Sequence, residues 1–218
     1  MRVLITGTSK GIGKATAERF LKEGYEVIGL DLLNATIAHP NYQHYICDVS
    51  KKNSLPNIKD VAYIFNNAGT QNDHDISNNL VGTINVTEKY AFQDKIKAVL
   101  FNASASAHSG FEFPEYVASK AGILGYMKNV ATRLAEYGAT ANSISLGGVL
   151  TESNAPVLED ENSWNQIMEA TPLKKWATLK EVCDWAYFLL VVNQSASGQD
   201  ILIDNGEYNL NSTFVWPK

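Results

Sequence analysis

Tyr116 and Lys120 are a pair of residues whose types and spacing could do acid–base chemistry. Residues 116–136 have the composition of a long helix, which Gly138 closes. Residues four apart share one helix face, so the phenol and the ammonium would lie one turn apart. A nearby cation lowers the pKa of a phenol from its usual value of about 10. Such a phenol could act as a base near neutral pH and as an acid in reverse, although the same spacing is common on solvated helix faces.

A glycine-rich turn near the N-terminus predicts a phosphate-binding site. Residues 2–13 read RVLITGTSKGIG, in which an apolar run is followed at once by Gly7, Gly11 and Gly13. The run predicts a strand buried on both faces, and residues 14–23 predict a helix that stops at Gly24. Free N–H groups at the start of this helix would face an anion. An ordinary glycine-rich connection is the alternative, because the spacing differs from the commoner Gly-x-Gly-x-x-Gly.

A carboxylate follows the second predicted strand. Residues 25–31 predict a strand that ends on Asp31, 18 residues beyond Gly13. An acid at this place in a dinucleotide-binding unit accepts hydrogen bonds from the adenosine ribose, and it would repel a 2′-phosphate. Lys10, inside the glycine turn, could instead help to hold a 2′-phosphate. We therefore expect NAD as the cofactor, with NADP as the alternative.

The elements that must position these residues are those of an α/β fold. Strands are predicted at 44–49, 61–69 and 97–104, a helix at 78–91, and loops at 34–41 and 105–115. Residues 51–60 include Pro56 and are too few for a full crossover helix between parallel neighbours. The sheet should therefore be thinly covered at this point.

Composition excludes several classes of partner. The 218 residues are 45% hydrophobic, with a formal net charge of −5, so no basic surface for nucleic acid is expected. The longest apolar run, 186–192, is far shorter than the roughly 20 residues of a membrane helix, and the start lacks a signal-peptide layout, so a cytoplasmic protein without membrane contact is expected. Cys47 and Cys183 are interpreted as buried thiols, and no metal site is expected.

Several motifs, in order along nearly the whole chain, resemble the short-chain dehydrogenase/reductase family. They are TGTSKGIG at 6–13, DV at 48–49, NNAG at 66–69, YVASK at 116–120, GGVLT at 147–151, PL at 172–173 and SGQDILIDNG at 197–206. The resemblance implies a single Rossmann-like, doubly wound α/β domain over residues 1–218, with about seven parallel strands and helices on both faces. It also implies an NAD(P)-dependent oxidoreductase that transfers a hydride between nicotinamide and an alcohol or carbonyl substrate.

The resemblance implies a role for each matched residue. Tyr116 would be the acid/base, Lys120 would lower its pKa and hold the nicotinamide ribose, and Ser104 would polarise the substrate carbonyl. Asn79 would belong to a water-linked proton path through Lys120, although it follows the NNAG motif by far fewer residues than is usual. The cofactor-binding residues would be Gly7, Ser9, Lys10, Gly11, Ile12, Gly13, Asp31, Asp48, Val49, Asn67, Ala68, Gly69, Tyr116, Lys120, Val149 and Thr151.

The serine assignment depends on the alignment. The family usually places its serine thirteen residues before the tyrosine, where this chain has Ala103. Alignment on the strand end selects Ser104, with one residue deleted from the following loop, and Ser106 is the alternative. The alternative function is a nucleotide-sensing binding protein with a degenerate active site, since the same fold also hosts regulators.

The substrate side is expected in a loop over about 151–171. Trp164 is interpreted as an anchor that packs this loop on the core, and the acidic run 159–161 disfavours a strongly anionic substrate. A small or medium alcohol or carbonyl compound is expected. The resemblance further implies a homotetramer or homodimer formed through the helices after Asn79 and Tyr116, and an apolar outer face near Trp185 and Phe188 would be consistent with it.

Overall fold

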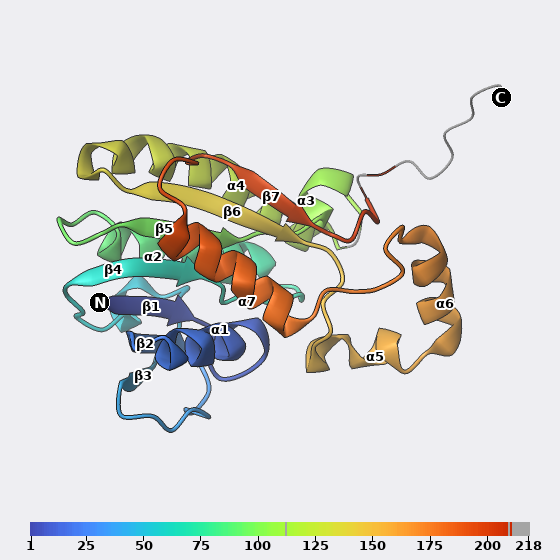
Figure 1. Ribbon diagram of the computed structural model, residues 1–218, viewed down its shortest axis with the longest axis horizontal. Helices are drawn as coiled ribbons and strands as arrows, with labels where there is room; N and C mark the ends of the chain where they lie inside the picture. The colour runs from blue at the N-terminus through green and yellow to red at the C-terminus, as the bar shows by residue number, and fades with distance from the viewer. Residues whose placement is uncertain (112, 209, 211–218) are drawn as a thin grey trace.

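Seven parallel strands form the central sheet of the computed structural model, which describes residues 1–111, 113–208 and 210 (Figure 1). The strands are β1 (Arg2–Thr6), β2 (Glu26–Asp31), β3 (Tyr42–Ile46), β4 (Val61–Asn66), β5 (Ala98–Asn102), β6 (Thr140–Leu146) and β7 (Asp200–Ile203). Their order is β3-β2-β1-β4-β5-β6-β7. The chain adds β2 and β3 on one side of β1 and β4 to β7 on the other, so the order of the strands reverses between β1 and β4. In such a sheet the ligand site lies outside the carboxyl ends of the strands at the reversal. The predicted doubly wound α/β fold is confirmed.

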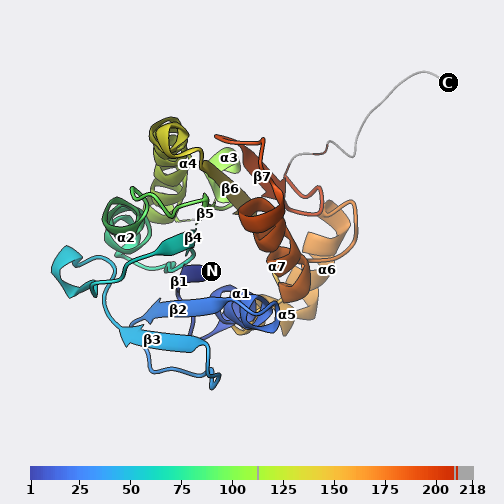
Figure 2. The same cartoon turned by 60° about the vertical axis from the view of Figure 1, so that its left-hand side comes forward.

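Helices cover both faces of the sheet (Figure 2). The α-helices of the described residues are α1 (Gly11–Lys22), α2 (Gly82–Tyr90), α3 (Ser106–Ser109), α4 (Pro114–Leu134), α5 (Ala155–Leu158), α6 (Glu161–Ala170) and α7 (Leu179–Tyr187). α1 and α7 pack on one face, and α2 and α4 contribute to the core on the other. Within β1, Val3 and Ile5 pack in the core on the face of α1 and α7, and Leu4 packs in the core on the face of α2 and α4. Both faces of β1 are therefore buried, which explains its unbroken apolar run.

The two connections that lead into and out of β3 contain no α-helix among the described residues. As expected, residues 51–60 form only a single 3₁₀ turn, Lys52–Ser54. The sheet order corrects one assumption, because β3 lies at the edge and β4 lies beside β1, so the two are not neighbours. β3 also spans Tyr42–Ile46 rather than the predicted 44–49. It is a half-exposed edge strand, whose ends an apolar pattern marks poorly.

Two segments predicted as loops contain helices. α3 lies within residues 105–115, where Gly110 ends it with a left-handed φ of 71°. α5 and α6 lie within residues 152–171, and the Asp160 side chain accepts a hydrogen bond from Ser163 N to cap α6. In Figure 1, α5 and α6 lie beyond the carboxyl ends of the strands. The helix predicted from residue 78 begins earlier, with a π-helical segment at Ile76–Val81.

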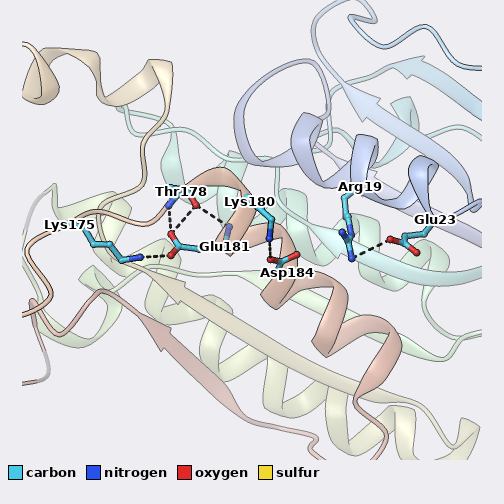
Figure 3. Close-up of polar contacts among 7 residues, drawn as sticks. All are labelled: Arg19, Glu23, Lys175, Thr178, Lys180, Glu181 and Asp184. Carbon is cyan, nitrogen blue, oxygen red and sulfur yellow. Dashed lines mark hydrogen bonds and ion pairs between the residues drawn. The ribbon is translucent and has the colours of Figure 1, made fainter.

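A reciprocal pair of hydrogen bonds fixes the start of α7 (Figure 3). Thr178 Oγ1 accepts from Glu181 N at 3.2 Å, and Glu181 Oε2 accepts from Thr178 N at 2.8 Å. Lys175 forms an ion pair with the same carboxylate. Just before this cap, Ala177 N donates to Gly148 O at 3.0 Å, so the start of α7 is joined to the segment after β6. Nowhere in the described residues does a helix have the length and apolar character needed to cross a membrane.

Candidate active site

The glycine turn joins β1 to α1 by folding tightly on itself. Gly7 and Gly11 have left-handed φ angles of 76° and 55°. A Cβ on Gly13 would lie 2.0 Å from Gly7 O and 2.6 Å from Asn67 Nδ2, so only glycine fits there. The turn predicted from the sequence is therefore formed, and α1 begins at Gly11 itself.

The N-terminus of α1 offers free donors to a ligand. Lys10 occupies the N-cap position without a side-chain hydrogen bond, and the first turn contains no acidic residue. Its N–H groups and the positive end of the helix dipole suit a phosphate. Beside them is a cleft of about 410 Å³, whose lining residues are Gly11, Leu150, Thr151, Glu152, Ala155, Leu158, Glu159 and Leu179. Gly11 and Thr151, both predicted to bind the cofactor, thus line the same cleft.

Asp31 lies beside the glycine turn, as its place at the end of β2 predicted. Its Oδ2 accepts a hydrogen bond from Ser9 N at 2.9 Å, and its Oδ1 accepts from Leu33 N at 2.9 Å. Thr36 Oγ1 donates to Ser9 O at 2.7 Å and ties the following loop to the same turn. The carboxylate is therefore oriented before any nucleotide binds, with lone pairs left for ribose hydroxyls.

The NNAG segment joins the ends of three strands. Thr6 Oγ1 accepts hydrogen bonds from Asn67 N at 2.9 Å and from Ala68 N at 2.8 Å. Asn102, at the end of β5, donates through Nδ2 to Asn67 Oδ1 at 3.0 Å. Asn102 Oδ1 is buried and has no hydrogen-bond partner among the described atoms. This acceptor, the glycine cradle and the uncapped helix together fit a dinucleotide at the carboxyl ends of the strands.

Tyr116 and Lys120 lie on one face of α4, as their spacing predicted. The Lys120 Nζ is 5.6 Å from the centre of the Tyr116 ring. It donates a hydrogen bond to Asn102 O at 2.8 Å, which anchors the lysine to the end of β5. Burial lowers the pKa of Lys120 to about 8, while the charge of Asp75 opposes this shift. The site therefore holds an ammonium against a phenol ring in a desolvated setting.

Asn79 is fully buried in the π-helical segment. Its Oδ1 accepts from Thr70 N at 2.7 Å, and its Nδ2 donates to Thr70 O at 2.9 Å and to Ser119 Oγ at 3.1 Å. Ser119 Oγ in turn donates to Tyr116 O at 2.7 Å. Asn79 thus connects the end of β4 to the helix of Tyr116. Ser119 was missed as a site residue, although its place between Tyr116 and Lys120 could have drawn attention to it.

Ser104 and Ser106 lie together. The Ser104 Oγ donates to Ser106 Oγ at 3.0 Å, and both side chains are buried. Ser104 follows β5, and Ser106 begins α3, which packs against α4. The structure therefore brings both candidate serines to the strand ends near the helix of Tyr116, and the choice between them stays a prediction.

Asp48 and Val49, two of the residues expected to bind the cofactor, lie just after β3. Hydrogen bonds from Ser50 hold the pKa of Asp48 below its usual value, with a further contribution from Lys51. A Cβ on Gly82 would lie 2.7 Å from Val49 Cγ2, so Val49 packs on the first residue of α2. On the other side of the site, Val149 forms a bridge with Ala177. These positions flank the carboxyl ends of the strands, and their contact with a cofactor stays a prediction.

Trp164 packs as expected. Its ring lies 5.3 Å from that of Trp176 in an edge-to-face arrangement, and Trp176 is buried. A Cβ on Gly148 would lie 2.0 Å from Trp176, which shows how closely this ring covers the segment after β6. Trp176 itself was missed in the sequence, because nothing in its neighbourhood marks it as the support of α6.

Comparisons with known proteins agree with this geometry. Residues 1–162 match the model of the family described as short chain dehydrogenase. Carbonyl reductase family member 4 of Xenopus tropicalis is 29% identical over 93% of this chain and 95% of its own length. A solved 4-hydroxyisoleucine dehydrogenase with NADH has a TM-score of 0.86 at 22% identity and covers 96% of this chain and 99% of its own. A structure from Agrobacterium tumefaciens with NADP has a TM-score of 0.84 at 22% identity, with coverages of 94% and 95%. The chain therefore belongs to the short-chain dehydrogenase family of NAD(P)-dependent oxidoreductases.

Proposed function

We propose that this protein interconverts a small or medium alcohol and its carbonyl compound, with Tyr116 as the acid/base. The bound nicotinamide would supply or accept the hydride. In alcohol oxidation Tyr116 takes the hydroxyl proton, and in carbonyl reduction it returns a proton to the oxygen. Ser104 would donate a hydrogen bond to that oxygen, with Ser106 as the alternative donor.

The position of Lys120 against Tyr116 carries this proposal. An ammonium close to a phenol favours the phenolate, and burial strengthens the interaction because little water screens it. Lys120 uses one of its three N–H donors on Asn102 O, so others remain for a ribose hydroxyl or a water. Asn79 would complete the proton path through such a water. The arrangement supports a working proton donor better than it supports a degenerate nucleotide sensor.

The preferred cofactor is proposed to be NAD. Similar folds hold NADH in one solved structure and NADP in another, so the preference rests on residues of this chain. The Asp31 carboxylate, held by Ser9 N and Leu33 N, would face the adenosine end of the nucleotide. A fixed negative charge there would repel a 2′-phosphate, whereas Lys10 would attract it. The proposal gives Asp31 the greater weight, because a carboxylate at the end of the second strand is expected to meet the adenosine ribose, so its charge should decide the preference.

The mechanism is tested by Tyr116→Phe, which removes the phenolic proton and keeps the ring. We expect turnover to fall by about 10²–10⁴-fold, because a positioned acid/base contributes that much. Stabilisation by NADH should persist, since a ligand that binds only the folded state raises its unfolding midpoint. The assay follows NADH formation across a panel of small and medium alcohols, alongside thermal unfolding with NADH.

Tyr126→Phe is the matched control. Tyr126 lies on the same helix, where its hydroxyl donates to Glu88 Oε1 at 2.8 Å, away from Lys120. It should keep wild-type turnover. A Tyr116→Phe variant that retained most of its activity would overturn the assignment of the acid/base.

A further inference from the structure

Asp75 is a buried carboxylate that the mechanism above does not use. It directly precedes the π-helical segment, and none of its surface is exposed, whereas Asp73 in the same loop is exposed. Its Oδ1 accepts from Thr70 Oγ1 at 2.9 Å and from Asn72 N at 2.9 Å. Its Oδ2 accepts from the same Asn72 N at 3.0 Å. These partners all donate, as a carboxylate acceptor requires, and a buried charge without partners would be costly.

The hydrogen bonds around Thr70 have a defined direction. Asn78 Nδ2 lies 3.2 Å from Thr70 Oγ1 and can only donate, so the threonine hydroxyl directs its own proton to Asp75. The backbone of Thr70 then holds both ends of the Asn79 amide, at 2.7 Å and 2.9 Å. Asp75 therefore fixes the residue that orients Asn79.

Asn79 and Lys120 both lie against Gly69. A Cβ on Gly69 would be 3.0 Å from Asn79 Oδ1 and 3.7 Å from Lys120 Nζ. The loop that Asp75 closes thus borders the ammonium directly. Burial lowers the pKa of Lys120, and the negative charge of Asp75 acts on the same group in the opposite direction.

We propose that Asp75 is a positioning residue for the reaction, which holds Thr70 and Asn79 against Lys120 and keeps that lysine in its ammonium form beside Tyr116. The inference rests on the proposed roles of Tyr116 and Lys120. It requires no proton transfer to Asp75, whose contribution is a fixed charge and a fixed loop.

Other charged groups near α4 do not replace this contribution. On α4 itself, Tyr116 is the titratable group beside Lys120. Two elements packed against α4, β6 and the π-helical segment, contain no titratable side chain. His108 of α3 is paired with Asp200 at 2.8 Å, and His74 is exposed on the loop. Among the described residues, Asp75 is the buried carboxylate whose field reaches Lys120.

The first test measures the protonation of Lys120 directly and needs no turnover. Protein labelled with ¹³C at lysine Cε is titrated by NMR, and Lys120→Arg assigns the signal. Asp75→Asn keeps an oxygen that Thr70 Oγ1 and Asn72 N can reach while it removes the charge. We expect the pKa of Lys120, about 8 in the wild type, to fall by about one unit.

Asp73→Asn is the matched control, because it removes an equal charge from the solvated part of the same loop. It should leave the Lys120 titration unchanged, since water and salt screen an exposed charge. Equal titrations in both variants and the wild type would overturn the proposal. Should Asp75→Asn not fold, Asp75→Ser keeps an acceptor without the charge and gives the same comparison.

The second test is the pH dependence of turnover. Removing a negative charge favours the deprotonated forms of Tyr116 and Lys120, so both limbs of the kcat profile should move to lower pH in Asp75→Asn. The KM for the nucleotide should stay near its wild-type value. A uniform fall in kcat without a shifted profile would contradict the role of the charge. A wild type without turnover would instead refute the proposed function, and the NMR result would still decide the effect of Asp75 on Lys120.

Discussion

Asp31 is the side chain that we expect to set the cofactor preference. Its two oxygens are held by backbone N–H groups of Ser9 and Leu33, so the charge is fixed beside the glycine turn. We expect NADH to raise the thermal unfolding midpoint strongly and NADPH to raise it little. Binding at a hundred times the dissociation constant adds about 2.7 kcal/mol to the free energy of unfolding. The measurement is a titration of the pure protein with each nucleotide.

Two variants separate the contributions of the charges. Asp31→Asn should bring the midpoint shift with NADPH closer to the shift with NADH, because it removes the repulsion of a 2′-phosphate. Lys10→Gln should leave the NADH response unchanged. A larger midpoint shift with NADPH than with NADH in the wild type would show that Lys10 outweighs Asp31.

The sequence predicts where a residue lies when helix or strand geometry determines its position. It does not predict the position of a residue that is buried only because a loop folds over it. Tyr116 and Lys120 were predictable because helix geometry alone brings residues four apart together. Asp31 was predictable because a strand end determines its place. Asp75 was missed, since it is buried only because Thr70 and Asn79 close the loop around it. Nothing in its local pattern distinguishes it from Asp73.

The start of α7 links an element's stability to the site. The Thr178 cap precedes Leu179, which lines the cleft beside α1. Thr178→Ala should lower the free energy of unfolding by about 1 kcal/mol, since Glu181 N loses the hydroxyl acceptor of the cap. The expected fall in midpoint is about 2–4 °C for a chain of this size. Thermal unfolding of both proteins at neutral pH measures it.

The stability difference between the wild type and Thr178→Ala should depend on pH through Glu181. Hydrogen bonds from Lys175 and Thr178 lower the pKa of Glu181 to about 2 from 4.5. The carboxylate's contribution is therefore complete above about pH 4.5 and is lost as the pH falls toward 2. The difference in unfolding midpoint between the wild type and Thr178→Ala should therefore shrink as the pH falls from about 4.5 toward 2. Thr132→Ala, at an exposed position of α4, is the control and should not destabilise the protein.

Elements were predictable where burial on both faces or a capping signal was strong. The inner strands follow from apolar runs, and α1 and α4 from helical composition. α3 and α5 were missed because each is a single turn of four residues, too short for a period to show. α6 was missed because its polar composition resembles a loop and no residue in it is fully buried. The π-helical segment has no sequence signal that distinguishes it from an α-helix.

At the scale of the whole molecule, an apolar surface lies on α7 and on a second π-helical turn, Phe188–Val192, that follows it. Trp185 is 40% exposed, Phe188 is 46% exposed and Val192 is 55% exposed. Trp185 and Phe188 line a shallow hollow together with Glu181 and Asp184. The outer side of α4 instead presents the ion pair of Arg133 with Glu88. An apolar surface of this kind is typical of a subunit contact.

We therefore expect a homodimer or homotetramer in which the α7 surface contributes a contact. Phe188→Glu should lower the molar mass measured by light scattering, because each two-fold contact would bury a copy of the charge on both sides. Ile46→Glu is the control, since Ile46 is 63% exposed on β3 at the far edge of the sheet. It should keep the wild-type mass. A wild type that scatters as a monomer at high concentration would contradict the oligomer, and a Phe188→Glu variant that stayed assembled would move the contact to the helices α2 and α4.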